Sequence, residues 1–128
     1  MRALVDTHVL LWWLSESHRL SRRCREAFEN PANELLWSAA SSWELAIKVG
    51  LGRLELPAPP RVLIPRVMQE QSLLSLDVTH AHVLAVAELP AHHHDPFDRL
   101  LIAQAQAESL PVLSADRIFE DYGRERLW

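Results

Sequence analysis

The sequence predicts an α/β protein with three layers, in which helices cover both faces of a central parallel sheet. Short apolar runs of strand-like composition alternate along the chain with amphipathic segments of helical period. This alternation favours parallel strands joined by helical crossovers. The chain has 128 residues, of which 48% are hydrophobic and 23% are charged. We therefore expect a single domain over residues 1–128 with a substantial core.

The predicted strands share an apolar composition and a polar residue or turn at their carboxyl ends. They cover residues 2–5, 34–38, 73–76 and 110–113, with a possible fifth strand at 126–128. The first of them ends at Asp6. The apolar run 8–14 is either a buried helix or a further strand, because periodicity alone does not distinguish the two.

The predicted helices are indicated by their caps and by an apolar face. Residues 21–29 are amphipathic, and Asn30-Pro31 stops them. Ser41 to Glu44 has the pattern of a capping box, so we expect a helix to open there and to end at Gly50. The remaining helices are expected over 61–71, over 79–88 with Thr79 as N-cap, from Pro96 onward, and briefly around Ile118.

The helix that begins at Pro96 carries an unusual concentration of charge at its start. Residues 94–99 contain a histidine, two carboxylates and an arginine. Asp95 is the predicted N-cap and Asp98 the third helical residue. Asp98 shares a helix face with the apolar residues of the next turn, which should look into the protein. An acid that points inward is costly unless something positive meets it.

Four acids fall at one edge of the predicted sheet. Asp6 ends the first strand, Glu44 opens the helix after the second, Asp98 opens the helix before the fourth, and Asp116 follows the fourth. In open parallel sheets, sites form beyond the carboxyl ends of the strands. Converging carboxylates repel one another unless cations are bound, and without a companion cysteine they select Mg²⁺ or Mn²⁺. We leave Asp77 out because its strand is a candidate for the sheet edge.

Each acid also has a purely structural interpretation. Asp6 and Asp116 could cap the helices that follow them. Glu44 could complete the capping box and pair with Lys48 one turn later, and Asp95 and Asp98 suit the start of any helix. The joint placement favours a metal site, since caps need not fall on one edge of one sheet.

Neighbouring polar residues are candidates for supporting roles. Thr7, Ser38 and Ser114 are hydroxyls at strand ends, where they could orient carboxylates or ligated waters, or cap helices. Arg99 could meet a phosphate oxygen. The run His92-His93-His94 is interpreted as a solvated loop, because three adjacent residues cannot all turn to one ion.

These residues resemble the PIN-domain family, and within it the VapC-like toxins of bacterial toxin–antitoxin pairs. The matching segments are 4–12, 38–48, 89–105 and 113–116, and the block D-P-F-D-R-L-L-I-A-Q-A is the most specific of them. The resemblance implies a PIN-like α/β/α fold and an endoribonuclease that depends on Mg²⁺ or Mn²⁺ and hydrolyses RNA with a metal-activated water. A homodimer and a cognate antitoxin partner are implied as well.

The resemblance also assigns roles to the acids. Asp6, Glu44, Asp98 and Asp116 would form the catalytic pocket, with Asp6 and Asp98 as direct metal ligands. Glu44 and Asp116 would complete the pocket directly or through water. Asp95 matches this branch of the family and is kept as a helper without a defined role.

Composition limits the partners and the compartment. The net charge of −4 gives no general attraction to nucleic acid, so RNA affinity must rest on local cations and bound ions. The single cysteine, Cys24, excludes an internal disulfide and fits a reducing compartment. No apolar stretch approaches the ~20 residues that a membrane helix needs. Asp6 interrupts the first apolar run, which argues against a signal peptide, and we expect a cytoplasmic protein.

Two alternatives to a ribonuclease stay open at the level of sequence. A phosphatase or receiver-type phosphoacceptor domain also places an aspartate after its first strand, although His8 stands where the phosphatase has a second aspartate. A non-catalytic interaction module could use the same acidic pocket to hold a basic segment of a partner.

Overall fold

Five parallel strands form the centre of the protein, which a computed structural model describes over residues 1–128. The strands are β1 (Arg2–Val5), β2 (Glu34–Ser38), β3 (Leu74–Leu76), β4 (Val112–Leu113) and β5 (Arg126–Leu127). Their spatial order is β3-β2-β1-β4-β5, so β1 lies in the middle and β3 at an edge. The chain builds the sheet outward from β1 to β3 and then returns to the other side of β1. The reversal of strand order therefore lies between β1 and β4, where ligands bind in folds of this type.

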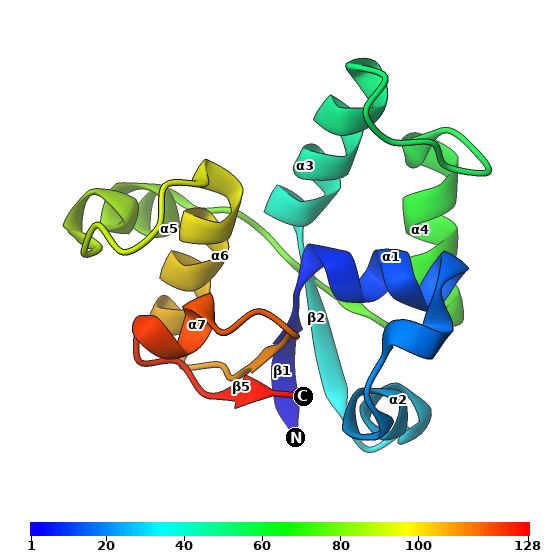
Figure 1. The fold of residues 1–128 in the computed structure, drawn as a ribbon, viewed down its shortest axis with the longest axis horizontal. Helices are drawn as coiled ribbons and strands as arrows, with labels where there is room; N and C mark the ends of the chain where they lie inside the picture. The colour runs from blue at the N-terminus through cyan, green and yellow to red at the C-terminus, as the bar shows by residue number, and fades with distance from the viewer.

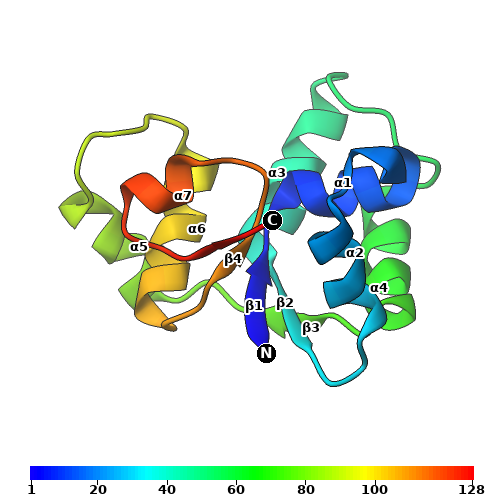
Figure 2. The same cartoon turned by 60° about the horizontal axis from the view of Figure 1, so that its bottom comes forward.

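Helices cover both faces of this sheet, as Figures 1 and 2 show. The helices are α1 (Thr7–Ser15), α2 (Arg22–Glu29), α3 (Ala39–Gly50), α4 (Pro60–Glu70), α5 (His80–Ala85), α6 (Pro96–Ala107) and α7 (Ile118–Asp121), with 3₁₀ turns η1 (Ser17–Arg19) and η2 (Val86–Glu88). None of them is long and apolar enough to cross a membrane.

The alternation of side chains along the strands divides the core in two. In β1, Ala3 and Val5 pack into a cluster with α1, α2 and α4, whereas Leu4 packs into a second cluster with α6 and α7. Both clusters are fully covered, because every crossover places its helices on a face of the sheet. The predicted three-layer arrangement is confirmed.

Two details differ from the sequence analysis or resolve it. The ambiguous run 8–14 is helical and belongs to α1. The predicted capping box at Ser41 is wrong, because α3 begins at Ala39 with Ser38 as its N-cap, whose Oγ accepts a bond from the Ala40 amide at 3.0 Å. Strand β2 ends at Ser38 and α3 begins at the next residue, so Ser41 already lies inside the helix and cannot be its N-cap. Glu44 consequently lies in the second turn of α3.

A buried polar network joins β2, β3 and α6. The side chain of Gln104 is fully buried, and its Oε1 accepts a hydrogen bond from Ser38 Oγ. Its Nε2 donates to the carbonyl of Asp77 at 3.3 Å and lies 3.3 Å from Nδ1 of His82. The other ring nitrogen of His82 lies 2.9 Å from Glu108 Oε1. The network ties the carboxyl ends of two strands to the helix that carries Asp98.

Replacing Gln104 with alanine should therefore lower the free energy of unfolding by about 1–3 kcal/mol, because Ser38 and the Asp77 carbonyl would lose a buried partner. Urea unfolding measures this loss. Gln69→Ala, an exposed change in α4, is the matched control and should stay within about 0.5 kcal/mol of the wild type. Equal losses in the two variants would contradict a structural role for the network.

Candidate active site

Asp6 occupies a helix N-cap but does not use its side chain as a cap. It follows β1 directly and precedes α1, yet its carboxylate makes no capping hydrogen bond to the helix. Oδ2 accepts a hydrogen bond from Ser114 Oγ at 2.7 Å. Oδ1 is buried and has no hydrogen-bond partner. Capping does not account for a carboxylate that is only 4% exposed, makes no capping bond and leaves one oxygen unpaired.

Asp98 lies in the first turn of α6, as the sequence predicted. Asp95 is the N-cap of this helix, and its Oδ1 accepts bonds from the amides of Phe97 and Asp98 at 2.9 and 3.0 Å. The side chain of Asp98 is half-buried, and its Oδ2 lies 2.9 Å from Nε2 of His93. His93 is thus the positive or donating group that the inward-facing acid required.

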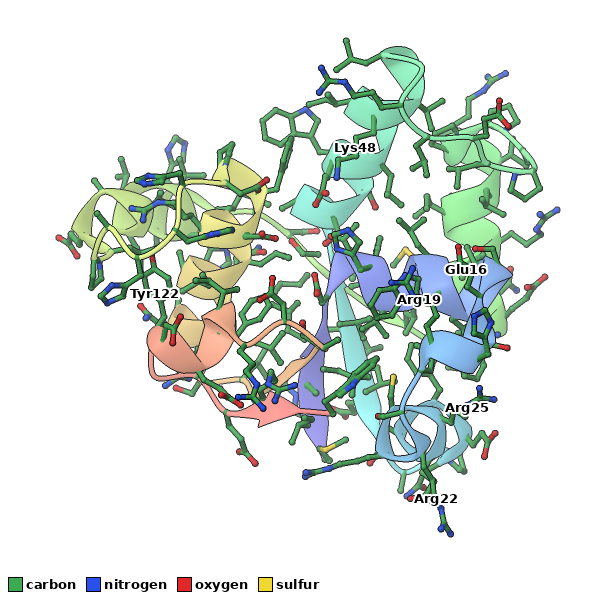
Figure 3. The ribbon with its side chains drawn as sticks, in the orientation of Figure 1. Glu16, Arg19, Arg22, Arg25, Lys48 and Tyr122 are labelled. Atoms are coloured by element: carbon green, nitrogen blue, oxygen red, sulfur yellow. The ribbon has the colours of Figure 1, made fainter.

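Glu44 reaches the same region from α3. It is buried, and its Oε2 pairs with Nζ of Lys48 one helical turn later, as predicted. Figure 3 shows Lys48 on this helix. Glu44 Oε1 is buried without a hydrogen-bond partner. The lysine therefore satisfies one of the two oxygens and leaves the other available.

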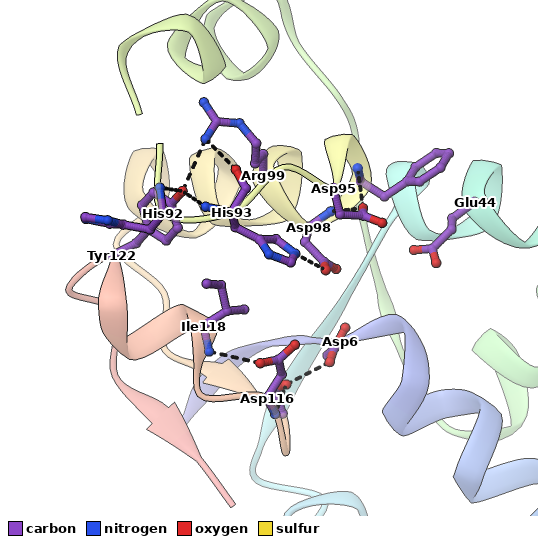
Figure 4. A network of polar contacts seen from close by, with 12 residues as sticks. Asp6, Glu44, His92, His93, Asp95, Asp98, Arg99, Asp116, Ile118 and Tyr122 are labelled. Atoms are coloured by element: carbon purple, nitrogen blue, oxygen red, sulfur yellow. Dashed lines mark hydrogen bonds and ion pairs between the residues drawn. The ribbon is translucent and has the colours of Figure 1, made fainter. Parts of the chain in front are cut away.

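Asp116 follows β4, and it both helps to start a helix and lies close to another acid of the site, Asp6. Its Oδ1 accepts a bond from the amide of Ile118 at 3.0 Å, so it does help to start α7. Its own amide donates to Ser114 Oγ at 2.9 Å, and the same hydroxyl donates to Asp6. Ser114 therefore links the loop after β4 to the end of β1, and Asp116 lies beside Asp6 in Figure 4.

The carboxylates are close enough to influence one another electrostatically. Burial raises the pKa of Asp6 to about 6, the charge of Asp98 adds to the rise, and the bond from Ser114 and the charge of His8 oppose it. Burial also raises the pKa of Asp98, which the bond from His93 lowers and the charges of Asp95 and Glu44 raise. Asp6 and Asp98 thus lie near each other beyond the end of β1, and Glu44 approaches Asp98 from α3 (Figure 4).

The donor set fits a hard divalent cation. The unpaired oxygens of Asp6 and Glu44 are carboxylate oxygens, which Mg²⁺ and Mn²⁺ prefer. No three His, Cys, Asp or Glu side chains lie close enough together to enclose an ion between them. An ion held here would therefore have at most two protein carboxylates, and water or substrate phosphates would have to supply its other ligands.

The predicted supporting residues separate into two groups. Ser114 contacts an acid directly. Thr7 instead donates its hydroxyl proton to Ser41 Oγ at 2.8 Å, and Ser38 caps α3 and bonds Gln104, so neither of these two makes a hydrogen bond to a carboxylate of the site.

The guanidinium of Arg99 is bound to the protein itself. It donates to the carbonyls of residues 86, 89, 90 and 93 and to the Tyr122 hydroxyl. Because its donors are used in these contacts, they do not support the expectation that Arg99 binds a phosphate oxygen.

Sequence reasoning missed His93. The interpretation of residues 92–94 as a solvated loop holds for the exposed His92 and His94, but it is wrong for His93, whose Nε2 lies 2.9 Å from Oδ2 of Asp98. The sequence shows that His93 precedes Asp98 by five residues, but His93 lies in a loop and Asp98 in a helix. The regular periods of helices and strands therefore do not predict that the two side chains meet.

A family model described as PIN domain matches residues 3–125. The chain belongs to the PIN-domain family. Ribonuclease VapC22 of Mycobacterium tuberculosis is 30% identical to this PIN domain over 123 residues, which cover 96% of the chain and 93% of that protein.

Two solved structures share the fold of this PIN domain. VapBC2 from Rickettsia felis, bound to a DNA fragment from its promoter, superposes with a TM-score of 0.70 at 14% identity, covering 98% of this chain and 97% of that one. FitAcB from Neisseria gonorrhoeae gives a TM-score of 0.65 at 20% identity, with coverages of 98% and 96%. The predicted PIN-like fold is confirmed.

The raised pKa of Asp6 implies that this PIN domain loses stability when the site ionises. Between pH 3.8 and about 6 the unfolded chain has lost the Asp6 proton while the folded protein keeps it. Stability therefore falls as the pH rises through this window. Asp6→Asn should be more stable than the wild type at pH 7.5 by about 1–3 kcal/mol, and the advantage should shrink toward pH 4.

Urea unfolding at both pH values, without added divalent ions, measures the effect. Asp77→Asn is the matched control, because Asp77 also follows a strand but is exposed at the sheet edge. A loss of stability in Asp6→Asn that is the same at pH 7.5 and pH 4 would contradict the assignment.

Proposed function

We propose that this PIN domain is a metal-dependent endoribonuclease, the toxin of a toxin–antitoxin pair, which hydrolyses RNA phosphodiester bonds. The observation that carries the proposal is the carboxylate of Asp6. It is buried near Asp98, makes no capping hydrogen bond to α1 and has one oxygen without a hydrogen-bond partner. The similarity to ribonuclease VapC22 over nearly the whole chain supports the substrate class.

Asp6 and Asp98 would hold Mg²⁺ or Mn²⁺, and Glu44 and Asp116 would complete the pocket directly or through water. When bound, such an ion supplies a nucleophilic water at neutral pH and stabilises charge on the scissile phosphate and the leaving oxygen. A bound cation would also lower the cost of the site, because its charge would compensate both the burial and the repulsion between carboxylates that raise the pKa of Asp6 and Asp98.

The side chains around the acids have distinct tasks in this proposal. Ser114 holds Asp6 through Oδ2 and leaves Oδ1 without a hydrogen-bond partner, so that Oδ1 would be the oxygen that ligates the ion. Lys48 neutralises part of the charge of Glu44, and its partly exposed ammonium is a local cation for an approaching RNA phosphate. Because the guanidinium of Arg99 is bound to backbone carbonyls, we assign contact with the RNA phosphate to Lys48 and not to Arg99.

The proposal includes two macromolecular partners besides RNA. A cognate antitoxin would hold the enzyme inactive, which the resemblance to VapC-like toxins and the shared fold with VapBC2 support. A second copy of the chain would form a homodimer. Co-expression with the neighbouring reading frame followed by size-exclusion chromatography with light scattering tests both partners.

Asp98→Asn tests the catalytic assignment. The variant should retain the fold and lose RNA cleavage by at least about 10²-fold, because an amide is a poor ligand for a hard cation. Cleavage of a fluorescent single-stranded RNA library with Mg²⁺, and with EDTA in its place, measures this. Asp77→Asn, the exposed acid at the end of the edge strand, is the control and should cleave as the wild type does.

Two outcomes would overturn the ribonuclease proposal. Cleavage by Asp98→Asn at the wild-type rate would remove the acids from catalysis. Tight binding of a co-expressed partner by a wild-type protein that cuts no RNA with Mg²⁺ or Mn²⁺ would favour the non-catalytic interaction module instead.

A further inference from the structure

The loop before α6 is fixed by contacts from two other parts of the chain. It runs from Leu89 to Asp95, after η2, and carries the three consecutive histidines. Arg99, on α6 directly after the loop, and Tyr122, just after α7, both bind its backbone. A loop with this many backbone bonds has one preferred path, which is unusual for an exposed connection.

Tyr122 is the first of these anchors. Its ring is buried, and its hydroxyl donates to the carbonyl of Pro90 at 2.6 Å. The same oxygen accepts from the amides of His92 and His93, both at 3.1 Å. The ring of His92 packs edge-on against the ring of Tyr122, with 5.1 Å between centroids. Figures 3 and 4 show Tyr122 beside the loop.

Arg99 is the second anchor. One guanidinium nitrogen, Nη1, donates to the carbonyls of Pro90 and His93 at 3.0 and 3.1 Å and also to the Tyr122 hydroxyl at 3.1 Å. The other, Nη2, donates to the carbonyls of Val86 and Leu89 at 3.0 and 3.4 Å. A charged donor to a carbonyl stabilises more than a neutral one, so Arg99 holds both ends of the turn.

The two anchors leave one side chain of the loop directed at the site. His93 is bonded through its amide to Tyr122 and through its carbonyl to Arg99, and its ring extends to Asp98, with 2.9 Å between Nε2 and Oδ2. Asp95 meanwhile holds the backbone amide of Asp98. Asp98 is therefore fixed twice, at its backbone by Asp95 and at its carboxylate by His93 (Figure 4).

We propose that His93 is a positioning residue, which donates its Nε2 proton to Oδ2 of Asp98 so that Oδ1 is presented to the divalent ion, with Tyr122 and Arg99 holding the loop that carries it. This inference rests on the proposed function, because it concerns the same pocket. A carboxylate that ligates a metal is commonly held by a further hydrogen bond, which selects its rotamer before the ion arrives. Nothing in this arrangement requires His93 to touch the ion.

The test is isothermal titration of Mn²⁺ into the wild type and two variants of residue 93. His93→Ala should weaken Mn²⁺ binding by about 10–100-fold, which is typical when the hydrogen-bond partner of a metal ligand is removed. His93→Gln should recover most of the affinity, because its side-chain amide can donate to Asp98 but is a poor substitute for imidazole as a metal ligand. Urea unfolding checks that both variants are folded under the conditions of the titration.

His94→Ala is the matched control, since His94 is the adjacent histidine, is exposed and has no hydrogen bond to Asp98. It should bind Mn²⁺ as the wild type does. Tyr122→Phe removes the hydroxyl that holds the loop and should weaken Mn²⁺ binding in the same direction as His93→Ala, without altering any group near the ion.

The remaining outcomes overturn the inference in distinguishable ways. Wild-type affinity in His93→Ala would show that His93 does not position Asp98, while the ribonuclease proposal stood unchanged. Equal weakening in His93→Gln and His93→Ala would make His93 a ligand rather than a positioning residue. A wild type that binds no Mn²⁺ and cuts no RNA would remove the proposed function and, with it, the role of His93.

Discussion

The central strand of the sheet is followed directly by Asp6, an aspartate that is almost completely buried. Burying a carboxylate costs free energy, and hydrogen bonds from the surrounding structure offset part of that cost. Water cannot solvate Asp6, and Asp98 and Glu44 bring further negative charge toward the same place. A protein with this many converging carboxylates is stable only if each receives a compensating partner. Lys48 and His93 are local partners, four and five residues from their acids, whereas Ser114 lies 108 positions from Asp6 and joins distant parts of the chain.

Each of three acids has one carboxylate oxygen bonded to a side chain of the protein. Ser114 bonds Asp6, Lys48 bonds Glu44, and His93 bonds Asp98. The second oxygens of Asp6 and Glu44 have no partner at all. Each of these acids is thus held through one oxygen, while the second oxygen of Asp6 and of Glu44 stays uncompensated.

The architecture of the sheet explains why these partners meet. Strand order reverses between β1 and β4, so the chain after β4 passes next to the end of β1 and carries Ser114 to Asp6. The helix α6 lies on the face opposite α1, and the buried amide of Gln104 ties it to the ends of β2 and β3. Asp98 is thereby held at the same sheet edge as Asp6, although 92 positions separate them in the sequence.

The sequence by itself determined most of the elements, the parallel sheet and the four acids near the strand ends, because short-range signals encode them: apolar runs, the Asp95-Pro96 helix start and the family block around Asp98. It left the run 8–14 open between helix and strand, because that run is apolar nearly throughout. It misplaced the start of α3, because a strand and a helix that join without a loop share the residue Ser38 as end and cap. Only the tertiary structure decided which oxygens are paired and which are free. It also decided that Arg99 binds the loop before α6 and that His93 bonds Asp98. These contacts depend on the packing of Tyr122 against the loop, which no local sequence period predicts.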